Sequence, residues 1–376
     1  MAGIYLHIPF CKQACFYCDF HFSVNQDKKN DLVAALLQEA AMRKNEIGKE
    51  PIKTVYFGGG TPSLLSADAI QRIFDTLAEH YDLSALQEVT LEANPDDLTA
   101  AYLRELRHTR VNRLSIGIQS FRDSDLKLMN RAHDAKQALR CVPESVDIGI
   151  ENISIDLIYG IQGLSLDDWN KNLQTALALP INHLSSYCLT VEPQTKLAKL
   201  VSSGELPNVN DDIAASHFEM LIETTEAAGI PWYEVSNFAK PGMESKHNSS
   251  YWSGEKYLGL GPGAHSFDGV KRSWNIKSNT GYIQNINKGQ LSSESEVLTA
   301  EEKFNESVLT ALRTRKGLSL EKTKQLCDDL KFSEIKEIIH QKEQLALLNI
   351  QSDHVILTTK GLLFADAIAS ELFIVS

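Results

Sequence analysis

The chain has 376 residues, of which 43% are hydrophobic, and its formal net charge is -12 at pH 7. This length suits one large domain with a smaller one attached, and no apolar run reaches the roughly 18 residues that a membrane-spanning helix needs. The acidic charge argues against a nucleic-acid-binding surface, so no nucleic-acid partner is predicted. The first residues lack the basic stretch of a signal peptide, so the sequence predicts a cytoplasmic protein.

A loop with three cysteines follows the first predicted strand, over residues 4–8, in which apolar and polar side chains alternate. Cys11, Cys15 and Cys18 have C-x3-C-x2-C spacing. Three thiolates so close together can bind three irons of a [4Fe-4S] cluster and leave the fourth iron open for chemistry. A Cys3His zinc site, with His21 as its fourth ligand, is the alternative interpretation. The other three cysteines are scattered, so no disulfide framework is expected.

Strand and helix predictions alternate through the first half of the chain. The strands predicted after the first one are 54–57, 89–91, 114–118, 153–158 and 184–189. Six β/α units in a row predict a parallel sheet with crossover helices, either an open barrel or a doubly wound sheet. Polar or glycine-rich residues gather where the strands end, which favours the barrel, because barrel enzymes carry their active sites at that end. These residues are the cysteines, Gly58 to Gly60, Glu92, Gln119 and Thr190, with Asp156 near the end of its strand.

The last part of the chain has a different pattern. Residues 200–290 are rich in Gly, Asn, Ser and Tyr, and an apolar helical stripe begins after Thr299. A charged helical stretch around 326–345, a short strand pair around 355–357 and a terminal helix follow. Because this order resembles a winged-helix module, we place a domain boundary near residue 295.

Five short strings lie at the predicted strand ends: HIPFC, FGGGTP, GIQSF, IDLIYG and HLSSYCLT. Together with the cysteine loop, Glu92 and Arg131, they resemble the radical S-adenosylmethionine (SAM) superfamily, in the branch of the oxygen-independent coproporphyrinogen oxidases. The resemblance covers nearly the whole chain. It implies an α/β fold in which a radical SAM partial (β/α)6 barrel at residues 1–295 precedes a C-terminal winged-helix-like α+β module at residues 296–376.

This resemblance implies two cofactors, a [4Fe-4S] cluster with Cys11, Cys15 and Cys18 as ligands and an exchangeable SAM molecule on the open iron. The residues that match SAM contacts are Tyr5, Tyr17, Gly59, Gly60, Thr61, Glu92, Gln119, Arg131, Asp156 and, as an approximate match, Thr190. Among them, Arg131 suits the SAM carboxylate through a bidentate contact, and Asp156 suits the ribose diol. A reductant for the cluster is therefore an implied partner.

Three features separate the chain from the oxidases of that branch. Phe20 stands where the oxidases carry a further cysteine, and only four residues precede Tyr5, where the oxidases have a long extension. The string HNSSYW at residues 247–252 resembles the mark of the HemW-type heme chaperones. That resemblance implies that heme is bound through His247, because a neutral imidazole suits heme iron, with the aromatic residues of the string, such as Tyr251, packed on the porphyrin.

Three positions near these motifs qualify the resemblance. His265, in a glycine-rich turn, is a second candidate for the heme ligand, although the turn itself explains it equally well. Ser245 stands where relatives often carry cysteine, which excludes a thioether to heme at that point. Gln162 replaces the proline that usually follows the Tyr-Gly pair of the fifth strand.

The leading hypothesis is a heme chaperone on a [4Fe-4S]- and SAM-binding scaffold. It would transfer heme to acceptor apo-hemoproteins, some of them membrane-associated. A homodimer is one expected oligomeric state. The alternative is a radical SAM oxidoreductase that decarboxylates coproporphyrinogen III without oxygen. A zinc-stabilised binding protein is the third hypothesis, and whether the chain catalyses a reaction is left open.

Overall fold

The structure is a computed structural model that describes residues 2–375. Its body is a twelve-stranded sheet, and a three-stranded sheet lies in the C-terminal part. The strands of the large sheet are β1 (Ala2–Ile8), β2 (Ile52–Gly59), β3 (Glu88–Ala93), β4 (Arg113–Gln119), β5 (Asn152–Tyr159), β6 (His183–Cys188), β7 (Trp232–Glu234), β8 (Asn237–Ala239), β9 (Lys256–Leu260), β10 (His265–Phe267), β11 (Lys271–Asn275) and β12 (Ser293–Val297). The helices of this part are α1 (Lys29–Met42), the short 3-10 helix η1 (Pro62–Leu64), α2 (Ala67–His80), α3 (Ala100–Leu106), α4 (Asp123–Leu128), α5 (Ala135–Asp147), α6 (Leu166–Ala178), α7 (Lys196–Ser202), α8 (Asp211–Ala227), α9 (Lys246–Trp252) and α10 (Asn279–Asn287).

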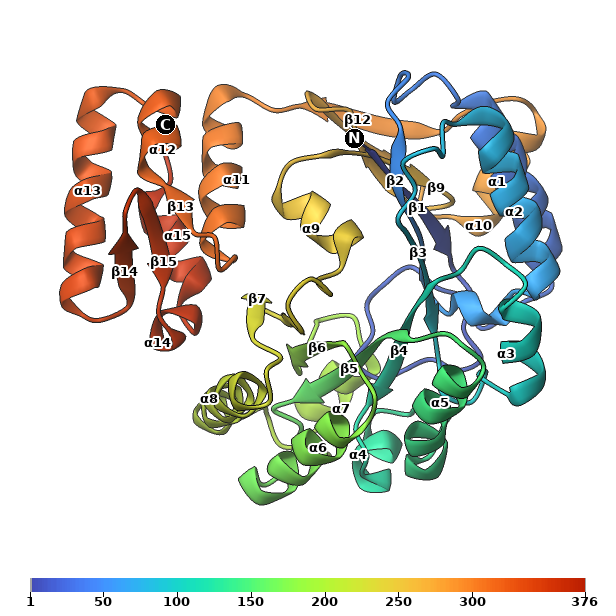
Figure 1. The fold of residues 1–376 in the computed structure, drawn as a ribbon, viewed down its shortest axis with the longest axis horizontal. Helices are drawn as coiled ribbons and strands as arrows, with labels where there is room; N and C mark the ends of the chain where they lie inside the picture. The colour runs from blue at the N-terminus through green and yellow to red at the C-terminus, as the bar shows by residue number, and fades with distance from the viewer. Residues whose placement is uncertain (1, 376) are drawn as a thin grey trace.

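The six strands predicted from the sequence are confirmed as β1 to β6. They lie side by side in chain order, and every neighbouring pair is parallel. Figure 1 shows them on a curve, with helices α1 to α6 along its outer side. This arrangement is the open barrel of β/α units, rather than the doubly wound alternative.

The large sheet continues past both ends of the six-stranded part. Strand β9 pairs parallel with β1, and β10, β11 and β12 follow it in antiparallel pairing. At the other end, β8 and β7 add antiparallel strands after β6. Most of these additions come from the Gly- and Asn-rich part of the chain, and β12 follows directly after it. The sequence predicts no strands here, because strands of three to five residues show almost no periodicity.

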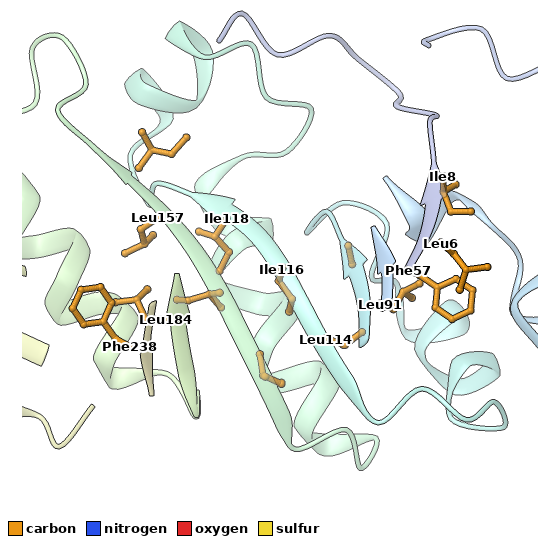
Figure 2. Close-up of a cluster of buried hydrophobic side chains, with 14 of the residues drawn as sticks. Leu6, Ile8, Phe57, Leu91, Leu114, Ile116, Ile118, Leu157, Leu184 and Phe238 are labelled. Atoms are coloured by element: carbon orange, nitrogen blue, oxygen red, sulfur yellow. The ribbon is translucent and has the colours of Figure 1, made fainter. Parts of the chain in front are cut away.

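The two faces of the barrel strands differ in polarity. Alternate residues on one face are apolar and fully buried, and Figure 2 labels several of these side chains, among them Leu6, Phe57, Leu91, Leu114 and Leu157. Burial of each such side chain contributes roughly 1.5–3 kcal/mol to stability. The opposite face, called here the inner face, carries Gly3, Tyr5 and His7 of β1, Thr54, Tyr56 and Gly58 of β2, Glu88, Thr90 and Glu92 of β3, Arg113, Ser115 and Gly117 of β4, Asn152, Ser154 and Asp156 of β5, and His183, Ser185 and Tyr187 of β6. A closed barrel fills this position with branched apolar side chains, so a polar inner face points to ligand binding.

The C-terminal module has the predicted order of elements. Its elements are α11 (Ala300–Leu312), β13 (Leu318–Ser319), α12 (Leu320–Leu326), α13 (Asp329–Gln344), β14 (Leu348–Gln351), β15 (His354–Leu357), α14 (Thr359–Leu362) and α15 (Ala365–Leu372). The module contacts both edges of the large sheet. Strand β12 runs into α11, and the loop after α11 binds β7 through N–H groups of Val235 and Arg315 that donate to the carbonyls of Arg313 and Tyr233. Residue 295 lies inside β12, and a division at that point stays a prediction.

No helix among residues 2–375 combines the length and the apolar character that crossing a membrane requires.

Candidate functional site

The cysteine loop lies at the carboxyl end of β1 and is held on several sides. The N–H of Cys11 donates to the carbonyl of Ser23, and the N–H of Ser23 donates to the carbonyl of Pro9, which closes the base of the loop. On the far side, the N–H of Phe16 donates to the carbonyl of Met129, and the carbonyl of Phe16 accepts from the N–H of Leu197. The three cysteines are free thiols of intermediate burial, so the loop presents a set of sulfur donors without bonding them to each other.

The zinc alternative is not assembled in this structure. Among the described residues, no group of three or more His, Cys, Asp or Glu side chains is arranged to hold a single metal ion. His21 is instead bound to Asn279, with 2.7 Å between Nε2 and Oδ1. Thiols that surround a larger cluster do not need to converge on one point, so the donor set fits an iron–sulfur cluster better than a single zinc ion.

The glycine turn after β2 packs directly against the base of the cysteine loop. The N–H of Gly60 donates to the carbonyl of Ile8, and the N–H of Thr61 donates to the carbonyl of Phe10. Gly59 has a φ of 111°, and a Cβ there would lie 2.6 Å from the ring of His7. The turn can approach the loop this closely only because two of its positions lack side chains.

Substitution of Gly60 by alanine is therefore expected to weaken the protein and its cluster loop together. The added Cβ would lie 2.7 Å from the backbone oxygen of Phe10, so two backbone segments must separate. We expect the free energy of unfolding in urea to fall by about 1–3 kcal/mol, with less iron retained after reconstitution. The matched control is Gly281→Ala in α10, where the Cβ meets only side-chain atoms. An equal loss in both variants would contradict this explanation.

Two half-buried carboxyl groups lie on the inner face, Glu92 beside the turn and Asp156 on β5. Glu92 accepts hydrogen bonds from the Tyr56 hydroxyl at 2.8 Å and from the Gly59 N–H at 3.1 Å. The pKa of Glu92 is raised to about 7, mainly by burial and also by the charge of Asp156, while the hydrogen bond from Tyr56 opposes the shift. Burial also raises the pKa of Asp156 to about 6, and the hydroxyl of Ser185 opposes this shift. Both groups therefore change charge near neutral pH.

Arg131 lies between the cysteine loop and the inner face. Its Nη1 donates to Sγ of Cys15 at 3.1 Å, and its Nη2 donates to Oδ1 of Asn94 at 2.6 Å and to the carbonyl of Gly117 at 2.8 Å. The Nη2 contacts occupy one side of the guanidinium, while the buried Nε has no partner. The predicted bidentate contact with a carboxylate therefore requires Arg131 to exchange at least one of these partners.

The remaining predicted SAM residues are only partly brought together. Tyr17 lies 3.5 Å from Nη1 of Arg131 through its hydroxyl, and Tyr5 lies deeper, with its ring stacked on Tyr56 at 6.0 Å. Gln119 is buried at the end of β4 and has a φ of 68°, a left-handed conformation that is uncommon for a non-glycine residue and concentrates at functional sites. Thr190 is exposed just after β6 and makes no hydrogen bond within residues 2–375.

A cavity of about 750 Å³ opens beside the cysteine loop. Cys15, Cys18 and the aromatic rings of Phe16, Phe20 and Phe22 line one side, and residues 192–196 line the other. Phe20 is 71% exposed, so the position where the oxidases carry a cysteine is here a solvent-facing aromatic side chain. A ligand can therefore reach the thiols from solvent.

His247 lies at the opposite end of the inner face, near the beginnings of the strands. Its Nδ1 is 2.8 Å from the hydroxyl of Thr54, and its Nε2 is 2.9 Å from the hydroxyl of Tyr251. The imidazole is only 1% exposed and stacks on the ring of Tyr56 at 4.9 Å. Burial and, to a smaller extent, the charge of Arg113 lower the pKa of His247 to about 3, so the ring is neutral. A neutral imidazole is the form that binds metals.

Helix α9 places His247 through a carboxylate from β3. Ser245 caps this helix, and Glu88 accepts from the backbone N–H groups of Lys246 and His247 at 2.9 and 3.0 Å. A carboxylate suits the positive end of a helix, and this one joins segments about 160 positions apart. His265 is not part of this arrangement, because it is exposed on β10, where its ring stacks on Trp274 at 5.9 Å.

Several residues of the site belong to none of the sequence motifs. Asn94 connects Arg131 to the Thr61 hydroxyl, and Thr54 and Glu88 orient His247. Each lies on a strand of the barrel or directly after it. The only sequence signal for these residues is that every second side chain of such a strand faces inward.

Comparison with known proteins places these features in one family. The sequence pattern described as the Radical SAM superfamily matches residues 5–176. A heme chaperone HemW from Bacillus subtilis is 38% identical over 363 residues, which cover 93% of this chain and 96% of that protein. A heme chaperone HemW from Mycobacterium tuberculosis (strain ATCC 25618 / H37Rv) is 35% identical over 378 residues, 98% of this chain and 94% of that protein. Among solved structures, coproporphyrinogen III oxidase (HemN) from Escherichia coli has a TM-score of 0.84 at 22% identity, over 99% of this chain and 90% of that chain, and this likeness concerns the fold.

Proposed function

The chain belongs to the HemW family of heme chaperones with a radical SAM domain, and from this membership we propose that it binds heme and transfers it to acceptor hemoproteins. The observation that carries the proposal is the neutral imidazole of His247, held in an aromatic setting on the inner face. We propose His247 as the heme ligand, with Tyr56 and Tyr251 as its aromatic neighbours. Because both ring nitrogens are hydrogen-bonded and buried, heme binding requires α9 to move and Tyr251 to release Nε2.

We propose the carboxyl end of the barrel as the cofactor site. Cys11, Cys15 and Cys18 would bind a [4Fe-4S] cluster, which supplies a low-potential electron and an open iron when it is bound. Gly59 and Gly60 would admit the amino acid end of SAM close to the backbone. Glu92 and Arg131 would bind its charged groups. The remaining proposed SAM contacts are Tyr5, Tyr17, Thr61, Gln119, Asp156 and Thr190.

The binding of SAM is expected to weaken on acidification. Glu92 has a pKa of about 7, so its ionised fraction falls from about 90% one pH unit above this value to about 10% one unit below it. Only the ionised form attracts the ammonium of SAM. Asp156, with a pKa of about 6, adds to the loss at the acidic end. Equilibrium dialysis of SAM with cluster-loaded protein should therefore give an affinity that rises with pH through 7.

The same measurement on Glu92→Gln identifies the group responsible. This variant should bind SAM about tenfold more weakly above pH 7, and its pH dependence should be much flatter. The exposed Glu79→Gln in α2 is the control and should retain the wild-type profile. A steep dependence that persists in Glu92→Gln would assign the titration to another group.

The proposed heme function is tested by an anaerobic titration of cluster-loaded protein with heme, followed at the Soret band, and by transfer of that heme to an apo-hemoprotein. Saturable binding and transfer are expected. Incubation with coproporphyrinogen III, SAM and a reductant distinguishes the alternative, because the chaperone is expected to form no protoporphyrinogen. A cluster reductant, membrane-associated acceptors, a cytoplasmic location and a homodimer remain predictions.

A further inference from the structure

Arg113 is the largest charged side chain on the inner face, and its guanidinium forms no hydrogen bond or ion pair with residues 2–375. It begins β4 and is only 1% exposed. Its Nε is fully buried and has no partner among these residues. Arginine cannot lose its proton in proteins, and a buried guanidinium without a hydrogen bond or an ion pair is strongly unfavourable. Such a group in a folded protein points to an anion that binds there.

The neighbours of Arg113 on the adjacent strands are also unsatisfied. Arg113 is in register with Thr90 of β3 and with Asn152 of β5. Oγ1 of Thr90 and Oδ1 of Asn152 are both buried without a hydrogen-bond partner. Buried polar atoms are nearly always paired in native structures, so three unpaired groups on three neighbouring strands mark one place where a ligand is missing.

The carboxylates of the inner face do not serve as this missing anion. Glu88 accepts from the backbone of α9, and Glu92 accepts from Tyr56 and Gly59. Asp156 is hydrogen-bonded by Ser115 at 3.5 Å and lies further along the strands. Burial raises the pKa of Glu92 and of Asp156, and the charge of Arg113 opposes this shift, but neither carboxylate forms an ion pair with it, and each has hydrogen-bond partners of its own.

The position of Arg113 relates it to His247. The register joins Tyr56 of β2 to Thr90 and Thr90 to Arg113, so two strand spacings, about 10 Å, separate Arg113 from Tyr56. Tyr56 is the residue that stacks on His247. A porphyrin that is bound through its metal at His247 carries its two propionates at its edge, at a comparable distance from the metal. The planar fork of a guanidinium matches the geometry of a carboxylate.

We propose that Arg113, together with the Thr90 hydroxyl, binds a propionate of the heme and so forms the carboxylate subsite of the chaperone. When the propionate binds, the Thr90 hydroxyl donates to the carboxylate beside the guanidinium. Oδ1 of Asn152, an unpaired acceptor in this structure, then accepts from Nε of Arg113. This inference rests on the proposed heme function and adds to it the group that orients the porphyrin.

The test compares heme with heme dimethyl ester, in which both propionates have lost their charge. Wild-type protein is expected to bind heme at least about tenfold more tightly than the ester, because a charge-assisted contact is lost with the ester. Arg113→Met should bind both at the affinity of the ester, and Arg113→Lys should recover part of the difference. The control Arg110→Gln removes the same charge at an exposed position three residues earlier and should keep the preference.

Urea unfolding without heme separates this role from a structural one. Replacement of a buried, unpaired charge by an apolar side chain of similar size is expected to leave stability unchanged or raised. Loss of folding in Arg113→Met would overturn the subsite in favour of a structural role. A preference for heme that survives in Arg113→Met would overturn it as well, while the heme function stands. Absence of heme binding in the wild type would instead overturn the proposed function.

Discussion

Replacement of Cys15 by alanine is expected to lower the iron content of reconstituted protein from about four atoms per chain to nearly none. A cluster that is already held by only three thiolates has no spare protein ligand. Cys15 is also the thiol that receives the hydrogen bond from Arg131, so its loss removes both a ligand and the contact that orients the loop against the inner face. Because the cluster carries the open iron, SAM binding should fall with the iron.

Iron and sulfide analysis with visible absorption under anaerobic conditions measures this effect. Cys327→Ala is the matched control, since Cys327 lies in the C-terminal module, where its thiol contacts the carbonyl of Thr323. That variant should bind as much iron as the wild type. Full iron retention in Cys15→Ala would sink the ligand assignment. One zinc per chain in the wild type would instead support the Cys3His alternative.

The barrel strands were predictable because their information is local. In β1, β2 and β4, apolar residues alternate with polar ones over five or more positions, and this period corresponds to one buried and one inner face. The cysteine loop was predictable for a similar reason, since cluster chemistry dictates its spacing. Both signals are contained in fewer than ten consecutive residues.

The additions to the sheet have no such signal. Strand β9 pairs with β1 across about 250 positions, and its place depends on contacts that only the folded chain makes. Arg43, directly after α1, donates to the carbonyl of Gly259, and the buried Glu39 of α1 accepts from the N–H of Gly261. Neither contact can be inferred from five residues of sequence.

The inner face explains why sequence motifs point to only part of the proposed heme end of the site. The string HNSSYW identifies His247, but α9 has seven residues, too few for periodicity to reveal a helix or its buried side. In the sequence, Arg113 resembles an ordinary charged residue before a strand. That its side chain lies on the inner face follows only from the register with β3 and β5. Motifs therefore identify the cofactor end, whereas the heme end depends on the topology.

The second large effect is expected from His247→Ala and Tyr251→Phe, which should change heme affinity in opposite directions. The alanine variant removes the proposed ligand, and its affinity should fall by at least about tenfold. Tyr251→Phe keeps the ring but removes the hydroxyl that lies 2.9 Å from Nε2. Since a hydrogen bond of this kind contributes about 1 kcal/mol, heme should bind this variant roughly fivefold more tightly. Anaerobic Soret titrations measure both.

The two variants should change heme affinity in opposite directions because the two hydrogen bonds of the imidazole have different roles. A metal-binding histidine commonly donates its second ring N–H to a nearby oxygen, which fixes its orientation. Thr54 can accept such a bond from Nδ1, which leaves Nε2 as the nitrogen for iron and Tyr251 as the group that iron must displace. Tyr257→Phe is the control, because Tyr257 packs edge-on against Tyr251 at 4.7 Å without a hydrogen bond to His247. If Tyr251→Phe instead weakened heme binding as severely as His247→Ala, the phenol oxygen rather than the imidazole would be the better candidate for the iron ligand.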